Sequence, residues 1–140
     1  MKRFLIMTLA CVAVGLIGAA LARSSPADSP KKEMAVVDLA DKTKLMKDTL
    51  QGKYIFVHDT EKMAQGQPCF YVYSYSEDSA GKPEAKSDKL VLSFHCQHVE
   101  RAKANQLILT YGMVPGTADL FEIREIQFAG SAEGHRVPAS

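Results

Sequence analysis

The sequence predicts an α+β fold, in which one N-terminal helix packs on a mainly antiparallel sheet of about five strands that carries one cross-strand disulfide. Three observations lead to this class. Apolar residues before residue 52 recur at roughly helical spacing. The chain beyond residue 52 is rich in the aromatic and β-branched residues that favour strands. Two cysteines lie near the ends of two of the expected strands. The folded domain is predicted to span residues 34–129.

An export signal precedes this domain. Lys2 and Arg3 are followed by an apolar run from Phe4 to Leu21, and Ala20-Leu21-Ala22 has the small-x-small pattern that signal peptidase recognises. Residues 1–22 are therefore predicted to be a cleaved signal peptide. The alternative is a retained membrane anchor, because the run approaches the roughly 20 apolar residues that span a bilayer. Cleavage leaves no stable membrane span and predicts a periplasmic or extracellular protein.

Polar segments flank the domain on both sides. Residues 23–33 are rich in Ser, Pro, Asp and Lys, so they are predicted to form a disordered linker, and residues 130–140 a flexible C-terminal tail. The whole chain has 17 basic and 16 acidic side chains, which are mixed along its length. Such a balance gives no basic field for nucleic acid, so the expected partner is a protein or a small molecule.

The predicted helix begins near Asp38 or Asp41, either of which can act as an N-cap, and runs to about Leu50. Gly52 is placed to end it. Its apolar stripe is imperfect and consists of Leu39, Lys42, Leu45, Met46 and Leu50. Threonines at positions 43 and 49 lower the helix propensity of this stretch.

Strands are predicted wherever apolar residues alternate between polar loops that contain Gly and Pro. The expected strands lie near Tyr54–His58, Cys69–Tyr75, Lys89–Cys96, Gln106–Tyr111 and Asp119–Phe128. The loops between them include Thr60–Pro68 and Ser76–Asp88. In the last strand the alternation changes phase between Ile123 and Ile126, which predicts a bulge near Arg124 or Glu125.

Cys69 and Cys96 are predicted to form a disulfide, because an exported chain favours such bonds and the third cysteine, Cys11, leaves with the signal. The bond would stabilise the fold by about 3–4 kcal/mol in the chain-entropy view. If the two cysteines lie opposite each other, the antiparallel register places Tyr71 opposite Phe94.

This register puts three tyrosines on one face of a strand: Tyr71, Tyr73 and Tyr75. They are either core aromatics or the lining of a shallow binding surface for a partner. The core interpretation is favoured, because a small sheet needs one covered face.

A metal or haem site is the main alternative use of the same region. His95, Cys96 and His98 are close in sequence, and imidazole and thiolate suit zinc or copper. Further ligands would come from Cys69, His58, Met63 or Met113. Alternation along a strand directs His95 away from Cys96, so only Cys96 and His98 are expected to converge. No Cys-x-x-Cys-His haem motif is present, His135 falls in the predicted tail, and no cofactor is predicted.

Catalytic motifs are also absent from the sequence. There is no Gly-x-Ser-x-Gly elbow and no Gly-rich phosphate loop. His58 and Asp59 near Glu61 offer an acid–base cluster, but the same residues suit a solvated strand end. We therefore expect a non-catalytic, exported binding or structural module of the bacterial envelope, with a periplasmic metal- or haem-binding protein as the alternative.

Three segments resemble parts of small exported bacterial proteins that have no assigned activity. They are HDTEKMAQGQPC at 58–69, SFHC at 93–96 and FAGSAEGHRVP at 128–138. The resemblance covers roughly Tyr54 to Pro138. It implies an exported bacterial origin and assigns no functional residue.

Overall fold

The computed structural model of the protein describes residues 32–140, so the predicted signal peptide, its anchor alternative and most of the predicted linker lie outside the described residues. The elements are β1 (Lys32–Leu45), β2 (Asp48–Asp59), α1 (Thr60–Ala64), β3 (Phe70–Ser74), a 3-10 turn (Ser87–Lys89), β4 (Leu90–Phe94), β5 (Gln97–Glu100), β6 (Ile108–Met113), β7 (Phe121–Gln127) and β8 (Glu133–Arg136). Within this part of the chain no helix is long and apolar enough to cross a membrane.

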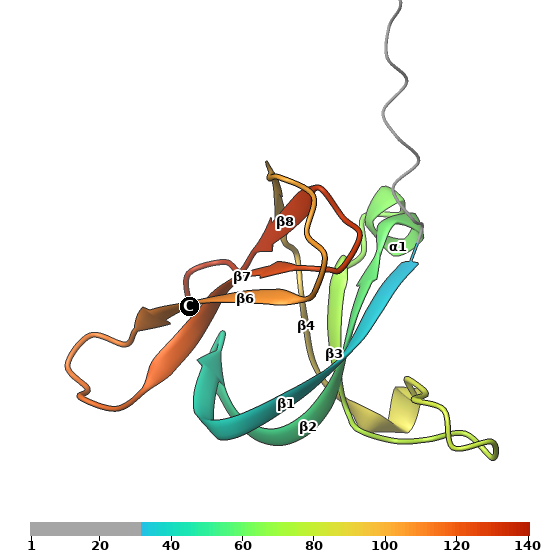
Figure 1. Cartoon of the computed structure of the whole chain (residues 1–140), viewed down its shortest axis with the longest axis horizontal. Helices are drawn as coiled ribbons and strands as arrows, with labels where there is room; N and C mark the ends of the chain where they lie inside the picture. Colours follow the sequence, from blue (N-terminus) through green and yellow to red (C-terminus); the bar gives the residue numbers. More distant parts are fainter. Residues whose placement is uncertain (1–31) are drawn as a thin grey trace, which may run out of the picture.

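All of the described strands belong to one mixed sheet. Its order is β4-β3-β2-β1-β7-β8-β5, and β6 pairs with β7. β1 and β7 run parallel, whereas the other neighbouring pairs are antiparallel. The sheet is strongly curled, as the bend of the β1–β2 hairpin shows (Figure 1).

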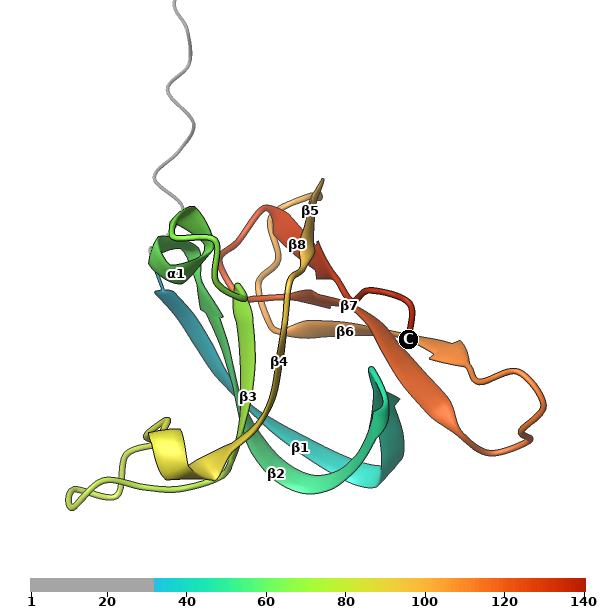
Figure 2. The ribbon, with the colours of Figure 1, turned by 180° about the vertical axis from the view of Figure 1, so that it is seen from behind.

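The two ends of the sheet order are joined directly by the chain. Only His95 and Cys96 separate β4 from β5, although these strands are at opposite ends of the order. The chain therefore steps from one edge of the sheet to the other, and Figure 2 shows β4 running straight on towards β5 and β8. We call this crossing, His95 and Cys96, the seam. The curl brings distant strands together at the seam.

The predicted α+β class is wrong, because the expected N-terminal helix is the long β1–β2 hairpin instead. Burial alternates along β1, with Val37 and Leu39 buried and, after a break in register, Thr43 and Leu45 buried. The buried residues keep the same two-residue phase across this break, and the apparent helical spacing arises because the predicted stripe continues through the turn at Met46 to Leu50 of β2. Period-two burial against the rest of the sheet outweighs the weak helix propensity of the segment.

The turn of this hairpin carries no sequence signal. Met46 and Lys47 connect the two strands, and Met46 has a φ of 56°. Two-residue hairpin turns with positive φ normally use Gly, Asn or Asp. Gly52, expected to end a helix, has a φ of 94° and lies in β2 opposite Leu39, where the register of the hairpin breaks.

The five predicted strands correspond to parts of β2, β3, β4, β6 and β7. The predicted bulge is confirmed, because Thr110 pairs with Glu125 and Tyr111 with Ile123, which leaves Arg124 without a partner residue in the ladder. The prediction of a flexible tail is wrong for residues 133–136, which form β8 between β5 and β7. The loop predicted from residue 60 contains α1.

The Cys69–Cys96 disulfide is confirmed, with a Cα–Cα distance of 6.2 Å. The register derived from it is wrong by one residue. Phe70 lies opposite Phe94 and Tyr71 opposite Ser93. The two cysteines are not a ladder pair, because β4 ends at Phe94 and Cys96 returns to Cys69 from the irregular seam.

The corrected register decides which aromatic residues form the core. The main cluster consists of Val37, Leu39, Leu45, Leu50, Phe56, Cys69, Phe70, Val72, Phe94, Ile123, Ile126 and Phe128. The ring of Phe70 lies 5.0 Å from that of Phe94 and 5.8 Å from that of Phe56. Tyr71, Tyr73 and Tyr75 belong to a second, smaller cluster with Ile55 and Val57 on the other face. Tyr71 is buried there, and the other two tyrosines are half-buried.

Candidate metal centre

Two cross-strand pairs bring ionisable side chains to the inner face of the sheet. Glu33 on β1 lies opposite His58 on β2. His98 on β5 lies opposite His135 on β8. Directly opposite residues project to the same face of a sheet, so each pair is held together by its own ladder. β7 stands between the two pairs in the sheet order, and the curl closes that distance.

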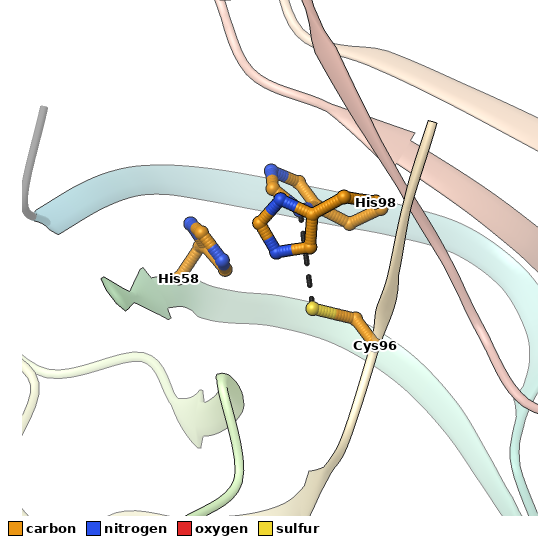
Figure 3. Close-up of side chains that lie close together, drawn as sticks. His58, Cys96 and His98 are labelled. Carbon is orange, nitrogen blue, oxygen red and sulfur yellow. Dashed lines mark hydrogen bonds between the residues drawn. The ribbon is translucent and has the colours of Figure 1, made fainter. Parts of the chain in front are cut away.

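The three imidazoles of His58, His98 and His135 form one cluster, which we call the histidine cluster. The ring centroid of His135 lies 3.9 Å from that of His58 and 5.0 Å from that of His98, and the His58 and His98 centroids are 5.2 Å apart. One ligand atom from each histidine and the sulfur of Cys96 all lie within 4.8 Å of one another. Figure 3 shows His58, His98 and Cys96 facing a common point.

The cluster is buried on one side and open on the other. The side chains of His58 and His135 are 0% exposed, whereas that of His98 is 31% exposed. An ion could therefore reach the cluster past His98, and the buried histidines would shield it from bulk water. This combination of a buried base and an open side is the arrangement expected of a site that exchanges a small ligand.

Carboxylates contact a nitrogen of each imidazole. Oε2 of Glu33 lies 3.1 Å from Nδ1 of His58 and 3.3 Å from Nε2 of His135. Oε2 of Glu133 lies 3.3 Å from Nδ1 of His98. A metal-ligating histidine typically uses its second nitrogen in this way, because the carboxylate fixes the ring orientation and makes the free nitrogen a better ligand.

Within the described residues, Nε2 of His58 and Nε2 of His135 are both buried and make no hydrogen bond, although Nε2 of His135 lies 3.3 Å from Oε2 of Glu33. The other nitrogen of the His58 ring, Nδ1, bonds to Glu33. Buried polar atoms nearly always have a partner, since an unsatisfied one costs roughly 1–3 kcal/mol. Nε2 of His58 is on a ring of the histidine cluster, so a bound ion is a direct explanation for its missing partner.

The charge states of Glu33 and His135 at neutral pH favour the binding of a cation. Burial raises the pKa of Glu33, but the hydrogen bonds and charges of His135 and His58 outweigh burial and lower this pKa to about 2. Glu33 is therefore a carboxylate at neutral pH. Burial lowers the pKa of His135, with Glu33 opposing the shift, so that the imidazole is neutral at pH 7. Neutral imidazole is the form that ligates metals.

Cys96 adjoins the histidine cluster through its sulfur. Sγ of Cys96 lies 3.9 Å from Nδ1 of His135, the contact dashed in Figure 3. The same sulfur is bonded to Cys69, which is 1% exposed and packs in the main core. A disulfide sulfur carries no negative charge, so in this state Cys96 contributes little as a ligand. The oxidised site therefore offers three imidazoles and an open position.

The structure brings together part of the ligand set predicted from sequence. His58, His98 and Cys96 converge, as the alternation argument allowed for the last two. His95 is exposed and lies outside the cluster. Met63 on α1 and Met113 on β6 are 38% and 57% exposed.

Two residues of the site were missed in the sequence. His135 was assigned to a tail, because residues 133–136 contain no apolar side chain that would signal a strand. Glu33 was assigned to the linker, yet it begins the period-two run that continues through Ala35, Val37 and Leu39. That alternation was the available signal, and it was hidden by the helix interpretation.

The acid–base cluster considered for His58, Asp59 and Glu61 does not form around His58. Oδ1 of Asp59 accepts a hydrogen bond from the backbone N–H of Lys62 at 3.1 Å and so caps α1. The imidazole of His58 bonds to Glu33 instead. Asp59 thus has a structural role at the start of a short helix.

Comparison of the chain with protein-family models, with curated proteins and with solved structures gives no match in any of the three. This agrees with the sequence resemblance, which leads to no named family.

Proposed function

We propose that this chain is a non-catalytic, exported binding module whose ligand is a divalent transition-metal ion, held by His58, His98 and His135. The observation that carries the proposal is the convergence of the three imidazoles with one another, within 4.8 Å between their ligand atoms, around a buried nitrogen of His58 that has no partner. Glu33 and Glu133 act as outer partners that orient the rings.

Zinc and copper fit these ligands best. Imidazole suits both ions, and three histidines with one open position is a known zinc arrangement. Hard cations such as calcium and magnesium prefer six or more oxygen ligands, which the cluster does not offer. A single ion fits the cluster better than haem does, because the His58 and His135 ring centroids are only 3.9 Å apart and both rings are fully buried.

Export is the second part of the proposal. A disulfide between Cys69 and Cys96 is typical of an oxidising compartment, and the N-terminal pattern of the sequence favours secretion. The periplasm or the cell exterior would supply both the oxidant for the bond and free metal ions.

The test compares two exposed histidines on either side of the same cysteine. Isothermal titration with Zn²⁺ and with Cu²⁺ is carried out on the oxidised protein and on His98→Ala and His95→Ala variants. Loss of His98 removes a ligand and is expected to weaken binding by at least about 100-fold, more than the roughly 10–100-fold typical of losing an outer partner. His95→Ala removes another exposed imidazole, which lies outside the cluster, and is expected to leave the affinity unchanged.

Two results would overturn the proposal. One is an affinity that is the same in both variants and in the parent. The other is binding of Zn²⁺ and Cu²⁺ no tighter than millimolar, which is the level expected of scattered surface histidines. Because His98 is on an exposed face, its removal is not expected to unfold the chain, and circular dichroism of each variant checks this.

A further inference from the structure

We infer that the Cys69–Cys96 bond is a redox gate on the metal site, so that reduction of the bond supplies the thiolate of Cys96 as a fourth ligand and tightens metal binding. This inference rests on the proposed function, since it concerns the same site. The sulfur of Cys96 belongs both to the disulfide and to the converging ligand set.

The position of Cys96 gives its sulfur two mutually exclusive partners. Sγ of Cys96 is bonded to Cys69 and is also 3.9 Å from Nδ1 of His135. While the sulfurs are joined, Cys96 carries no charge for a cation. After reduction, the thiolate of Cys96 would complete a tetrahedral set of one sulfur and three nitrogens, which is the closed geometry of tightly held zinc.

The chemical step balances with a dithiol as reductant. A protein or small-molecule dithiol attacks the bond through one thiolate, forms a mixed disulfide, and is released as its own disulfide. Two electrons and two protons pass to Cys69 and Cys96, which become thiols. Binding of the metal then displaces the proton of the Cys96 thiol to solvent, and the S–metal bond forms. Cys96 is partly exposed at the seam, whereas Cys69 is buried, so the attacking thiolate approaches the bond from the side of Cys96.

The imidazoles do not depend on the disulfide for their positions. His98 and His135 are held opposite each other by the β5–β8 ladder, and His58 opposite Glu33 by the β1–β2 ladder. Cys69 remains a buried core residue at the start of β3. Only the Cys96 side of the bond lies at the metal cluster, so reduction changes the ligand set without removing the histidines.

Thermodynamic linkage relates the effect of reduction on zinc affinity to the midpoint potential of the disulfide. If reduction tightens zinc binding by a given factor, saturating zinc must favour the reduced form by the same factor. For this two-electron couple, a tenfold difference in affinity corresponds to a rise of about 30 mV in the midpoint potential. We expect the reduced protein to bind zinc at least tenfold more tightly than the oxidised protein.

The decisive experiment uses two variants that both lack the bond. In a Cys11→Ser background, zinc affinity is measured without oxygen for the oxidised protein, for the protein reduced with a phosphine, and for Cys69→Ser and Cys96→Ser. Cys69→Ser leaves Cys96 as a free thiol and is expected to bind like the reduced protein. Cys96→Ser leaves only Cys69 and is expected to bind like the oxidised protein. Cobalt in place of zinc should show thiolate charge-transfer absorption with the reduced protein and with Cys69→Ser, and not with the oxidised protein or with Cys96→Ser.

Equal affinity of the two serine variants would overturn the redox gate. The proposed metal site would survive that result if His98→Ala still weakens binding of the oxidised protein, so the two failures are distinguishable. Alkylation of the reduced protein with unaltered Cys69 and Cys96 gives a second measurement that needs neither serine variant to fold. Zinc is expected to slow labelling of Cys96 and not of Cys69, and unchanged labelling of Cys96 would likewise reject the gate.

Discussion

The carboxylate of Glu33 accepts a hydrogen bond of 3.1 Å from Nδ1 of His58, and both side chains are almost completely buried. Each residue is the direct cross-strand neighbour of the other in the β1–β2 hairpin. The same carboxylate oxygen is 3.3 Å from His135 on β8, so Glu33 also links the hairpin to the far side of the sheet. A single carboxylate therefore orients two of the three proposed metal ligands.

Replacement of Glu33 by Gln should destabilise the metal-free protein at pH 7 by about 1–3 kcal/mol, because the buried histidines lose a charged acceptor. The pKa of Glu33 is lowered to about 2, from an ordinary 4.5. Its stabilisation is therefore complete above about pH 4.5 and is lost as the pH falls towards 2. Urea unfolding of both proteins between pH 7 and 3 should show a difference that shrinks with acidity. Equal stability at pH 7 would contradict this role of Glu33.

Replacement of Gly134 by Ala should destabilise the fold by no more than about 1 kcal/mol, because the overlapping carboxylate is the end of a flexible side chain and can move away at the cost of its ion pair. A Cβ at Gly134 would overlap Oε1 of Glu125, the oxygen that accepts a 2.7 Å hydrogen bond from Nε of Arg101. The measurement is urea unfolding. Glu125→Ala alone should cost a similar amount, because it removes the same ion pair with the exposed Arg101.

The double variant is the control for this steric explanation. Addition of Gly134→Ala to Glu125→Ala should cost much less than Gly134→Ala alone, because the overlapping carboxylate has been removed. Additive losses in the double variant would show that another contact of Gly134 is responsible.

Truncation of Phe70 to Ala should cost about 3–5 kcal/mol, the range for removal of a fully buried aromatic ring. Phe70 is 0% exposed and stacks on Phe94 within the main core. Val91→Ala on β4 is the control, because Val91 is 40% exposed and its truncation should change stability by no more than about 0.5 kcal/mol. Similar losses in the two variants would contradict the observed register of β3 and β4.

Zinc should raise the melting temperature of the oxidised protein. A ligand that binds only the folded state stabilises it by about 2.7 kcal/mol at 100 times its Kd. For a domain of this size that corresponds to roughly 10 °C. Scanning calorimetry with zinc, and again after addition of a chelator, should show the rise and its reversal. The rise should persist in His95→Ala and shrink to roughly 2 °C or less in His98→Ala at the same zinc concentration. An equal rise in both would exclude the histidine cluster as the site.

In β3 and β4 the disulfide could be predicted from the sequence, whereas the pairing of the strand residues could not. The disulfide was predictable from two cysteines in a chain that is predicted to be exported. The pairing of Phe70 with Phe94 was not, because the prediction assumed that a disulfide joins opposite residues of a ladder. Cys96 lies beyond the end of β4 and reaches Cys69 from the irregular seam. A shift of one residue in the register exchanges the two faces of a strand. The observed register therefore places the three tyrosines outside the main core.

The hairpin at Met46 and the strand at His135 were missed for different physical reasons. Met46 adopts a φ of 56°, which sequence rules reserve for Gly, Asn or Asp, so the turn could not be recognised. β8 has the sequence Glu-Gly-His-Arg and contains no apolar residue that would mark it as a strand. It is a strand because β5 and β7 satisfy its backbone groups on both sides.

By itself, the amino-acid sequence determined which segments alternate as strands, where a bulge interrupts β7, and that Cys69 and Cys96 pair. Those features depend on local periodicity and on the identity of a few residues. Tertiary structure alone decided that the first segment is a strand and that His58, His98 and His135 meet beside Cys96. The physical reason is that the cluster is assembled by the curl of the sheet, which brings β2 against β5 and β8 although no local pattern encodes that approach.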